Sequence, residues 1–471
     1  MGSEGTNWKP LALLCTAFFM AMLDSSIVLV ALPSIDGDLA FPAADLQWVM
    51  SAYMLSFGGL LLLGGRAADL LGQRRMFTIG VALFGVASLG AGLSVSPAML
   101  IAARALQGIA AAVMTPAAQS LLMTTFAEGP ERNKALGFWT ASGAIGGTAG
   151  WLIGGPITDG LGWEWIFFLN FPIGAAIALL TPLVLPEARV ERTRRRFDLA
   201  GATTITVALA TLVFAVVEAP QVGWATGRTI GLLALAAALV GAFVAIEARS
   251  PAPLLPLGVL RSRGLAAGNL ILLCLGMMAL GMPFILTRYA QEVLGWTPVQ
   301  FGFAFVVMPI LVAVGSAIGQ SLATKGATRA VACGGMVLTG LACLGLTQVS
   351  VAGDYLGELF VPFVGFGLGV GFAYVSGSIA SLSGVAEGDA GLASGMNNAS
   401  FQIGGAIGTA ILSSVAISGA AGGTGASALT AGFQSAFAVA IAFGAIGALA
   451  AFVLLRRGGE PAVADAEAAN A

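Results

Sequence analysis

The sequence contains no histidine, and only 9% of its 471 residues are charged. Imidazole is therefore excluded both as a general base and as a metal ligand. The net charge is −2, and no run of basic residues is long enough to indicate binding to nucleic acid. We expect any proton that the protein moves to be carried by Asp, Glu or water.

Cysteine is also scarce, and the four cysteines lie singly in apolar runs, at Cys15, Cys274, Cys333 and Cys343. Without a CxxC pair they form no metal or redox motif, and we expect small buried side chains. The sequence also lacks a GxxxxGK[ST] phosphate-binding loop and an evident nucleophile–base pair. These absences disfavour an enzyme, and they indicate neither a metal nor any other cofactor.

What the sequence has instead is apolar residues, which make up 58% of the chain. A soluble protein carries about 25% charged residues, so this composition requires a lipid environment. Fourteen stretches are apolar enough to cross a bilayer, which takes about 20 residues each. They lie at 11–33, 47–63, 77–95, 98–125, 134–157, 164–185, 199–218, 229–248, 266–287, 300–322, 329–349, 356–380, 394–417 and 432–455. The first is too long for a signal-peptide core, so we expect it to be retained.

Basic residues are unevenly distributed between the connections of these stretches. All but three of the 21 Lys and Arg residues fall on one face of the alternating arrangement, the exceptions being Arg104, Arg228 and Arg288. Such a bias marks the cytoplasmic face of a membrane protein. Together with an Ala- and Gly-rich composition, it predicts a multi-pass protein of a bacterial cytoplasmic membrane. Both termini are then cytoplasmic, and residues 458–471 form a disordered tail.

Two parts of the chain resemble each other. "ALGFWTASGAIGGTAG" from Ala135 and "ASGMNNASFQIGGAIG" from Ala393 agree at 8 of 16 positions. "GRAADLLGQRR" from Gly65 resembles "GQSLATKGATR" from Gly319 more faintly, at a nearly equal offset. The repeat predicts an all-α membrane protein of two six-helix halves in the same orientation, with a substrate site between them. The predicted boundaries are 1–190 for the N-terminal half, 191–260 for an inserted helix pair and 261–457 for the C-terminal half.

Asp24 is the only charged residue between Leu11 and Pro33. It lies roughly 20 Å into its helix, at about 1.5 Å per residue. A carboxylate in hydrocarbon is costly, so we expect Asp24 to face a cavity, where it can hold either a proton or a charge. This behaviour suits proton coupling. A structural carboxylate satisfied by neighbours such as Ser25 and Ser26 is the alternative.

Arg104 is the only cation deep inside a predicted span, and Gln107 lies three residues further along the same helical face. A buried arginine offers several hydrogen bonds to a carboxylate. The alternative is an arginine that extends outward to the membrane surface. Glu164, between Trp163 and Trp165 at an outer span end, is a candidate for an outer proton site.

Glycines are concentrated at two places where helices must approach or turn. Gly146, Gly150 and Gly154 form a stripe against which another helix can pack closely, and Pro156 can bend the same helix. The stripe serves either packing alone or a conformational switch. In the first cytoplasmic connection, a tight turn is expected from Gly65 and Gly72, and the charged residues nearby are Asp69, Arg74 and Arg75.

A set of aromatic, sulfur-containing and uncharged polar side chains is predicted to line the substrate cavity. Such surfaces adapt to varied apolar ligands and to organic cations, although ordinary packing is the alternative for each residue. The set consists of Ser25, Tyr53, Met54, Phe57, Gln107, Met114, Trp139, Met277, Tyr374, Asn397, Asn398 and Gln402.

Four segments together resemble the major facilitator superfamily, specifically its fourteen-span drug:proton antiporters. They are "LDSSIVLVALP" (23–33), "GGRAADLLGQRR" (64–75), "RALQGIAAAVMTPA" (104–117) and "GAIGGTAGWLIGGP" (143–156). The resemblance implies a major facilitator fold and proton transfer at the Arg104 position. It also implies that the segment from Gly64 to Arg75 latches the cytoplasmic side shut. Leu29, Trp151 and Glu164 depart from the usual Asn, Pro and Arg of the group.

The sequence therefore predicts a secondary transporter that exports amphipathic or cationic small molecules, such as drugs, antibiotics or a natural product, in exchange for protons. Its partners are the small-molecule substrate, protons and the lipid bilayer, and we expect it to act as a monomer. A proton-coupled uptake permease is the alternative, and Trp151 weakens the argument against it. A membrane protein that transports nothing is disfavoured by the deep Asp24 and Arg104.

Overall fold

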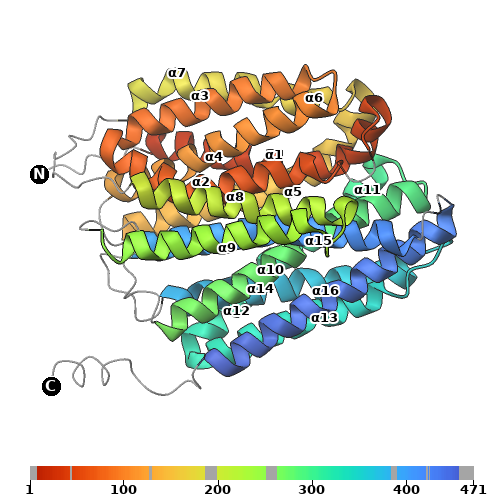
Figure 1. The fold of residues 1–471 in the computed structure, drawn as a ribbon. Coiled ribbons are helices and arrows are strands. Elements are labelled where there is room, and N and C mark those ends of the chain that lie inside the picture. Colours follow the sequence, from red (N-terminus) through yellow and green to blue (C-terminus); the bar gives the residue numbers. More distant parts are fainter. Residues whose placement is uncertain are drawn as a thin grey trace, which may run out of the picture.

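The computed structural model describes residues 8–42, 45–126, 130–185, 199–250, 262–382, 390–420, 423 and 425–455. All regular elements in these ranges are helices (Figure 1). The N-terminal bundle consists of α1 (Lys9–Leu39), α2 (Trp48–Leu71), α3 (Gln73–Gly92), α4 (Pro97–Thr125), α5 (Pro130–Leu161), α6 (Glu164–Phe168) and α7 (Asn170–Val184). The predicted tail at 458–471 and the longest predicted connections lie outside the described residues.

A helix pair, α8 (Leu199–Val222) and α9 (Gly227–Glu247), follows the N-terminal bundle. The C-terminal bundle contains α10 (Arg263–Arg288), α11 (Pro298–Phe305), α12 (Val307–Leu322), α13 (Thr328–Leu346), α14 (Phe360–Leu382), α15 (Ala390–Gly419) and α16 (Ala426–Leu454). Three short π-helical segments interrupt it at η2 (Tyr289–Val293), η3 (Ala323–Ala327) and η4 (Tyr355–Leu359). α1 begins and α16 ends at the same end of the molecule, which we call the terminal end, opposite the distal end (Figure 1).

Each predicted membrane stretch falls on a helix or on two consecutive helices. Within the described residues, eleven helices are long and apolar enough to cross a bilayer, and two shorter apolar helices lie at Trp48–Leu61 and Ala200–Val216. The stretch at 164–185 divides into α6 and α7, and the stretch at 300–322 divides into α11 and α12. The all-helical prediction is therefore confirmed, with two breaks that were not predicted.

Local signals explain where several helices begin. Ser96 accepts a hydrogen bond from the Met99 amide at the start of α4, and Pro97 follows it. Thr297 and Gln300 form a reciprocal capping box at the start of α11. Gly72 has φ of 101° between α2 and α3, so the tight turn predicted at this glycine is present.

The glycine stripe predicted on α5 packs against α1. A Cβ atom at Gly146 would overlap the backbone of Phe19, and one at Gly150 would overlap the Ser26 side chain. α15 packs against α10 in the same way, because a Cβ at Gly404 would overlap the carbonyl of Leu273. The predicted repeat thus coincides with the same close helix pair in both bundles.

The α8–α9 pair lies along the seam between the two bundles (Figure 1). α8 contacts both α2 and α15, and the Thr206 hydroxyl donates to the carbonyl of Gly59 at 3.0 Å. α2 and α15 also meet directly, since a Cβ at Gly58 would lie 3.0 Å from the Cβ of Gln402. The pair is therefore a third layer attached to the interface rather than a separate domain.

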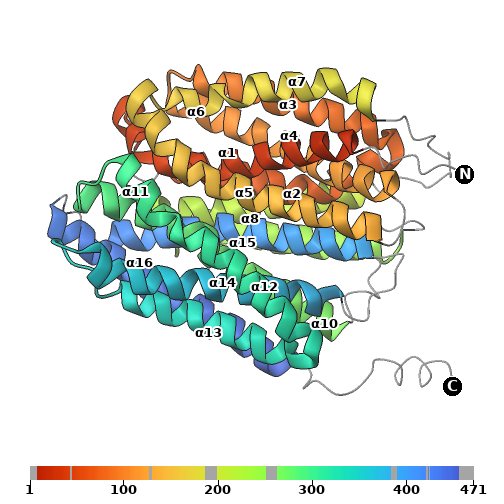
Figure 2. The same cartoon turned by 180° about the vertical axis from the view of Figure 1, so that it is seen from behind.

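The bundles converge toward the distal end, where α11 reaches across to α5 (Figures 1 and 2). The ring of Trp151 on α5 lies 4.0 Å, between centroids, from the ring of Phe305 on α11. The backbones of the same helices touch where a Cβ at Gly155 would lie 2.5 Å from the Cα of Val299. The Gln291 amide donates to the carbonyl of Val30 at 3.0 Å, so α1 is joined to the C-terminal bundle as well.

Candidate functional site

The two ionisable residues predicted deep in the membrane form one ion pair inside the N-terminal bundle. Nη1 of Arg104 donates to Oδ2 of Asp24 at 2.6 Å, and both side chains are 0% exposed. Asp24 comes from the middle of α1 and Arg104 from the third turn of α4. We expected Asp24 to face a cavity, but it is enclosed by protein because the arginine supplies its counter-charge.

Two amide side chains complete the shell around the carboxylate. Oδ1 of Asp24 accepts from Nδ2 of Asn170 at 2.8 Å and from Nε2 of Gln107 at 3.0 Å. The Gln107 amide also donates to the hydroxyl of Ser88 at 2.7 Å, and its Oε1 accepts from Arg104 at 2.8 Å. α1, α3, α4 and α7 therefore meet at one network, which we call the Asp24 cluster.

The guanidinium of Arg104 is held on its other sides by α2 and α6. Its Nε donates to the carbonyl of Val49 at 2.9 Å. Its Cζ lies 4.4 Å from the ring centroid of Tyr53 and 5.9 Å from that of Phe167. Aromatic faces stabilise a desolvated guanidinium, which explains how the cation remains charged in an apolar bundle.

The cluster has unused hydrogen-bonding capacity. Nη2 of Arg104, the hydroxyl of Tyr53 and Oδ1 of Asn170 are buried without hydrogen-bond partners among the described residues. Breaking a buried ion pair from one side costs several kcal/mol, about 3–5, because the remaining charge is left uncompensated. A change of charge at Asp24 would therefore have to rearrange Arg104 and its neighbours.

Several residues predicted to line a cavity are instead packed inside the N-terminal bundle. Met54, Phe57 and Met114 are buried, and a Cβ at Gly80 would overlap the backbone of Met114. Trp139 stacks on Phe18 with 4.3 Å between ring centroids. In this state these side chains support the helices around the cluster.

The predicted residues of the C-terminal bundle lie on α10, α14 and α15. Met277 meets α15 where a Cβ at Gly408 would overlap its backbone. Tyr374 packs edge-on against Phe401 at 5.4 Å and is 38% exposed. Three further predicted residues, Asn397, Asn398 and Gln402, lie on α15.

The remaining predicted residues lie on the helices as follows. Nη1 of Arg74 donates to the carbonyl of Leu185 at 3.2 Å, and Arg75 is exposed. The side chain of Asp69 falls outside the described residues. Glu164 begins α6, six residues before Asn170. The Ser25 hydroxyl donates back to the Met22 carbonyl, Gly154 faces α1, and Pro156 lies inside α5. Gly65 was predicted to take part in a tight turn, but it lies inside α2 and faces Pro116, and the turn is at Gly72.

Sequence reasoning missed two members of the cluster, Ser88 and Asn170. Asn170 is an uncharged amide in the apolar run "WIFFLN", and the rule applied to the amides of α15 would have identified it. Ser88 carries no such signal, because serine is common in membrane helices and usually bonds to its own backbone. Tyr53 was predicted as a substrate contact, and the structure places it against Arg104.

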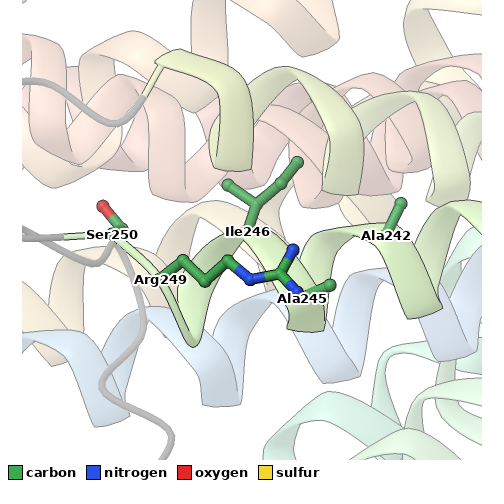
Figure 3. A pocket seen from close by; sticks show the side chains of 5 residues that line it. All are labelled: Ala242, Ala245, Ile246, Arg249 and Ser250. Carbon is green, nitrogen blue, oxygen red and sulfur yellow. The ribbon is translucent and has the colours of Figure 1, made fainter.

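A surface hollow lies away from this cluster, near the terminal end of α9 (Figure 3). Its volume is about 500 Å³, and it is lined by Ala242, Ala245, Ile246, Arg249 and Ser250. None of the predicted site residues lines it. Within the described part of the chain, no three His, Cys, Asp or Glu side chains are grouped so that they could hold a metal ion.

The family model described as the Major Facilitator Superfamily matches residues 14–409, which is most of the chain. The chain belongs to the major facilitator superfamily. This membership identifies a multi-pass membrane transporter rather than an enzyme, and transporters of this kind use ion gradients and no cofactor. The resemblance drawn from its four sequence segments is confirmed.

Three relatives are, by their names, export or resistance proteins, and they come from Amycolatopsis and Streptomyces species. The cephamycin export protein CmcT of Amycolatopsis lactamdurans is 40% identical over 88% of this chain and 86% of its own. The puromycin resistance protein pur8 of Streptomyces alboniger is 36% identical over 95% and 90%. The tetracenomycin C resistance and export protein of Streptomyces glaucescens is 34% identical over 87% and 76%.

Solved structures share the fold at low sequence identity. A bacterial homolog of the human lysosomal transporter Spinster has a TM-score of 0.68 at 14% identity, covering 98% of this chain and 100% of that one. The POT family transporter PepTSo has a TM-score of 0.71 at 14% identity, covering 96% and 97%. These likenesses concern the fold alone.

Proposed function

We propose that this superfamily member exports amphipathic small molecules of the antibiotic class across the cytoplasmic membrane in exchange for protons. The three relatives named above, by their names, export cephamycin or tetracenomycin C or confer resistance to puromycin. The single observation that supports the proton half of the exchange is the fully buried Asp24–Arg104 pair. Ionisable groups in this setting are costly and are retained for function.

The Asp24 cluster has two stable charge arrangements in this proposal. With Asp24 ionised, Arg104, Gln107 and Asn170 all donate to it and tie α1 to α4 and α7. When a proton arrives, the carboxyl no longer attracts the guanidinium and must donate its own proton. Oδ1 of Asn170 is a buried acceptor with no partner among the described residues, and it would receive that bond after rotation of the amide, whose Nδ2 now faces Asp24.

Protonation would then loosen one set of helix contacts and allow the bundles to rock. The described state joins them at the distal end, through Trp151 and Phe305 and through Gln291 and Val30. We assign the terminal end to the cytoplasm because Lys9, Arg74, Arg75, Arg249 and Arg263 all lie there. The state is accordingly one in which the outer side is closed.

The finer architecture belongs to the same proposal. We propose fourteen membrane spans, arranged as two six-helix halves with α8 and α9 as the inserted pair, acting as a monomer. The segment from Gly65 to Arg75 would latch the cytoplasmic side in the opposite state, and Glu164 would admit protons from outside. The cavity-lining assignments on α10, α14 and α15 are retained as candidate substrate contacts.

The proposal is tested in proteoliposomes that carry an imposed pH gradient and an internal pH dye. Tetracenomycin C, puromycin and a cephamycin are each added, and both drug and proton movement are recorded. We expect at least one compound to move against its gradient as protons move the other way. Asp24→Asn should abolish the coupled movement while the protein remains folded.

The matched control is Asp159→Asn, which removes an exposed carboxylate at the distal end of α5. It should exchange drug and protons like the wild type. Coupled exchange that survives Asp24→Asn would remove Asp24 from the proton path. If the rate of drug movement by the wild type did not depend on the pH gradient, antiport itself would be refuted.

A further inference from the structure

Among the described residues, the interior of the membrane domain contains one ion pair. Asp24 and Arg104 are the only charged residues that lie more than three residues from an end of the fourteen apolar stretches. Both belong to the N-terminal bundle, and they neutralise each other at 2.6 Å with no exposed surface. A substrate that crosses between the bundles therefore meets no unpaired charge at mid-membrane.

At mid-membrane the described part of the interface between the bundles is polar but uncharged. Gln402 of α15 lies against α2 at Gly58, and Gln291 reaches Val30 of α1. Trp151 and Phe305 supply aromatic surface at the same interface. Toward the distal end Arg288 is paired with Glu292, and Asp36 lies within electrostatic range of the same arginine. These charged side chains lie at the distal mouth of the interface and not at mid-membrane.

We propose that this transporter prefers uncharged amphipathic molecules over organic cations, an inference that rests on the proposed export function. An ion that leaves water for this interface loses hydration and gains no counter-charge, because Asp24 is already paired. An uncharged molecule loses far less, and the glutamine amides and aromatic rings can still orient it. Proton and substrate then communicate through helix movement and not by competing for one carboxylate.

The charge balance of transport distinguishes this arrangement from export of a cation. Exchange of an uncharged molecule for one proton moves one net positive charge inward. Such exchange is driven by the membrane potential as well as by the pH gradient. Exchange of a monovalent cation for one proton moves no net charge and is therefore independent of the membrane potential.

The test is equilibrium binding to the purified protein in detergent, where no gradient is present. Two probes share an aryl-phosphorus body: triphenylphosphine oxide is uncharged, and tetraphenylphosphonium is a cation. Binding is followed by intrinsic tryptophan fluorescence. We expect the wild type to bind the oxide roughly tenfold or more tightly than the cation.

A designed carboxylate at the interface should reverse this preference. Gln402→Glu is expected to tighten tetraphenylphosphonium binding about tenfold, because an unpaired carboxylate then faces the path. Gln402→Met keeps the size of the side chain without adding a charge, so tetraphenylphosphonium should still bind weakly. Gln348→Glu adds the same charge on the exposed loop after α13 and should change neither affinity.

Wild-type protein that binds the cation as tightly as the oxide would overturn the proposal. So would an unchanged cation affinity in Gln402→Glu protein that still binds the oxide, since the interface would then not be the binding surface. If neither probe binds, the same comparison is made with matched pairs of amines and their uncharged N-acetyl derivatives. The proposal is overturned if the cationic amine binds more tightly than its N-acetyl derivative in most of these pairs. Binding without proton exchange would refute the proposed antiport and leave this inference standing.

Discussion

The two bundles share their helix packing but differ in what their buried polar groups do. In the N-terminal bundle, Asp24, Arg104, Gln107 and Asn170 bond from helix to helix. In the C-terminal bundle, Thr339, Ser376 and Ser414 bond back to carbonyls of their own helices. The exception of interest is the hydroxyl of Ser400, which donates to Asn269 across α15 and α10 at 2.8 Å.

This difference separates two tasks that a transporter must perform. Close packing of α1 on α5 and of α10 on α15 uses glycines in both bundles, so a rigid frame is common to both. Among the described membrane interiors, the fully buried ion pair belongs to the N-terminal bundle. We infer that proton chemistry is confined to one bundle, while the other provides a neutral wall that moves against it.

The largest effect is expected when the ion pair is broken from one side. Arg104→Ala leaves the Asp24 carboxylate buried without a counter-charge and should destabilise the protein by about 3–5 kcal/mol. Unfolding in detergent, followed by denaturant titration, measures the loss. The double variant Asp24→Asn with Arg104→Gln should recover most of the stability but not proton coupling.

The comparison residue is Arg288 of the C-terminal bundle, which is nearly buried but pairs at the distal end with Glu292, whose side chain is 23% exposed. Arg288→Ala should cost only about 1 kcal/mol, because water can replace the partner. Equal costs for Arg104→Ala and Arg288→Ala would contradict the distinction between the bundles.

An intermediate effect is expected where the bundles touch. A Cβ at Gly302 would overlap the carbonyl of Trp151, so Gly302→Val should push α11 from α5 at a cost of about 1–3 kcal/mol. Opening of the distal contact is measured as faster reaction of an impermeant maleimide with Val30→Cys in a cysteine-free protein. Gly231→Val is the control, because no atom lies within 4 Å of a Cβ there. Unchanged reaction rates in Gly302→Val would show that this contact does not hold the distal end closed.

The smallest effect compares one hydrogen bond in each bundle. Asn170→Ala removes a donor to the charged Asp24 and should cost about 1.5–3 kcal/mol. Ser400→Ala removes a bond of equal length between neutral partners and should cost about 1 kcal/mol. Stability is again read from denaturant titration in detergent. If Ser400→Ala lowered the free energy of unfolding more than Asn170→Ala, the stronger hydrogen bond would lie in the C-terminal bundle, which would contradict the distinction between the bundles.

The fold was predictable from the sequence because each membrane helix is a long apolar run that can be recognised without its neighbours. Apolar length located the helices, and the glycine periodicity of α5 correctly indicated a closely packed helix partner. The breaks at Leu169 and Val306 were not predicted, although each has a local cause. Pro172 and Pro309 have no backbone N–H to donate to the carbonyls four residues earlier, at Phe168 and Phe305, where α6 and α11 end.

The candidate site was predictable only as separate residues. Asp24 and Arg104 each stood out because a charge in hydrocarbon is costly, but nothing local to either residue identifies the other as its partner. That pairing depends on the approach of α1 to α4, which is a tertiary contact. Trp151 appeared as an unexplained departure from its family pattern, and its contact with Phe305 now accounts for the aromatic side chain.

The central claim is that the proton acts at Asp24. It is tested most directly by proton release when substrate binds to the purified protein in lightly buffered detergent solution with a pH-indicator dye. The account predicts release of protons from the wild type when a transported compound is added. It predicts no release from Asp24→Asn that still binds the compound. Equal proton release from both proteins would contradict the claim and place the proton elsewhere in the transporter.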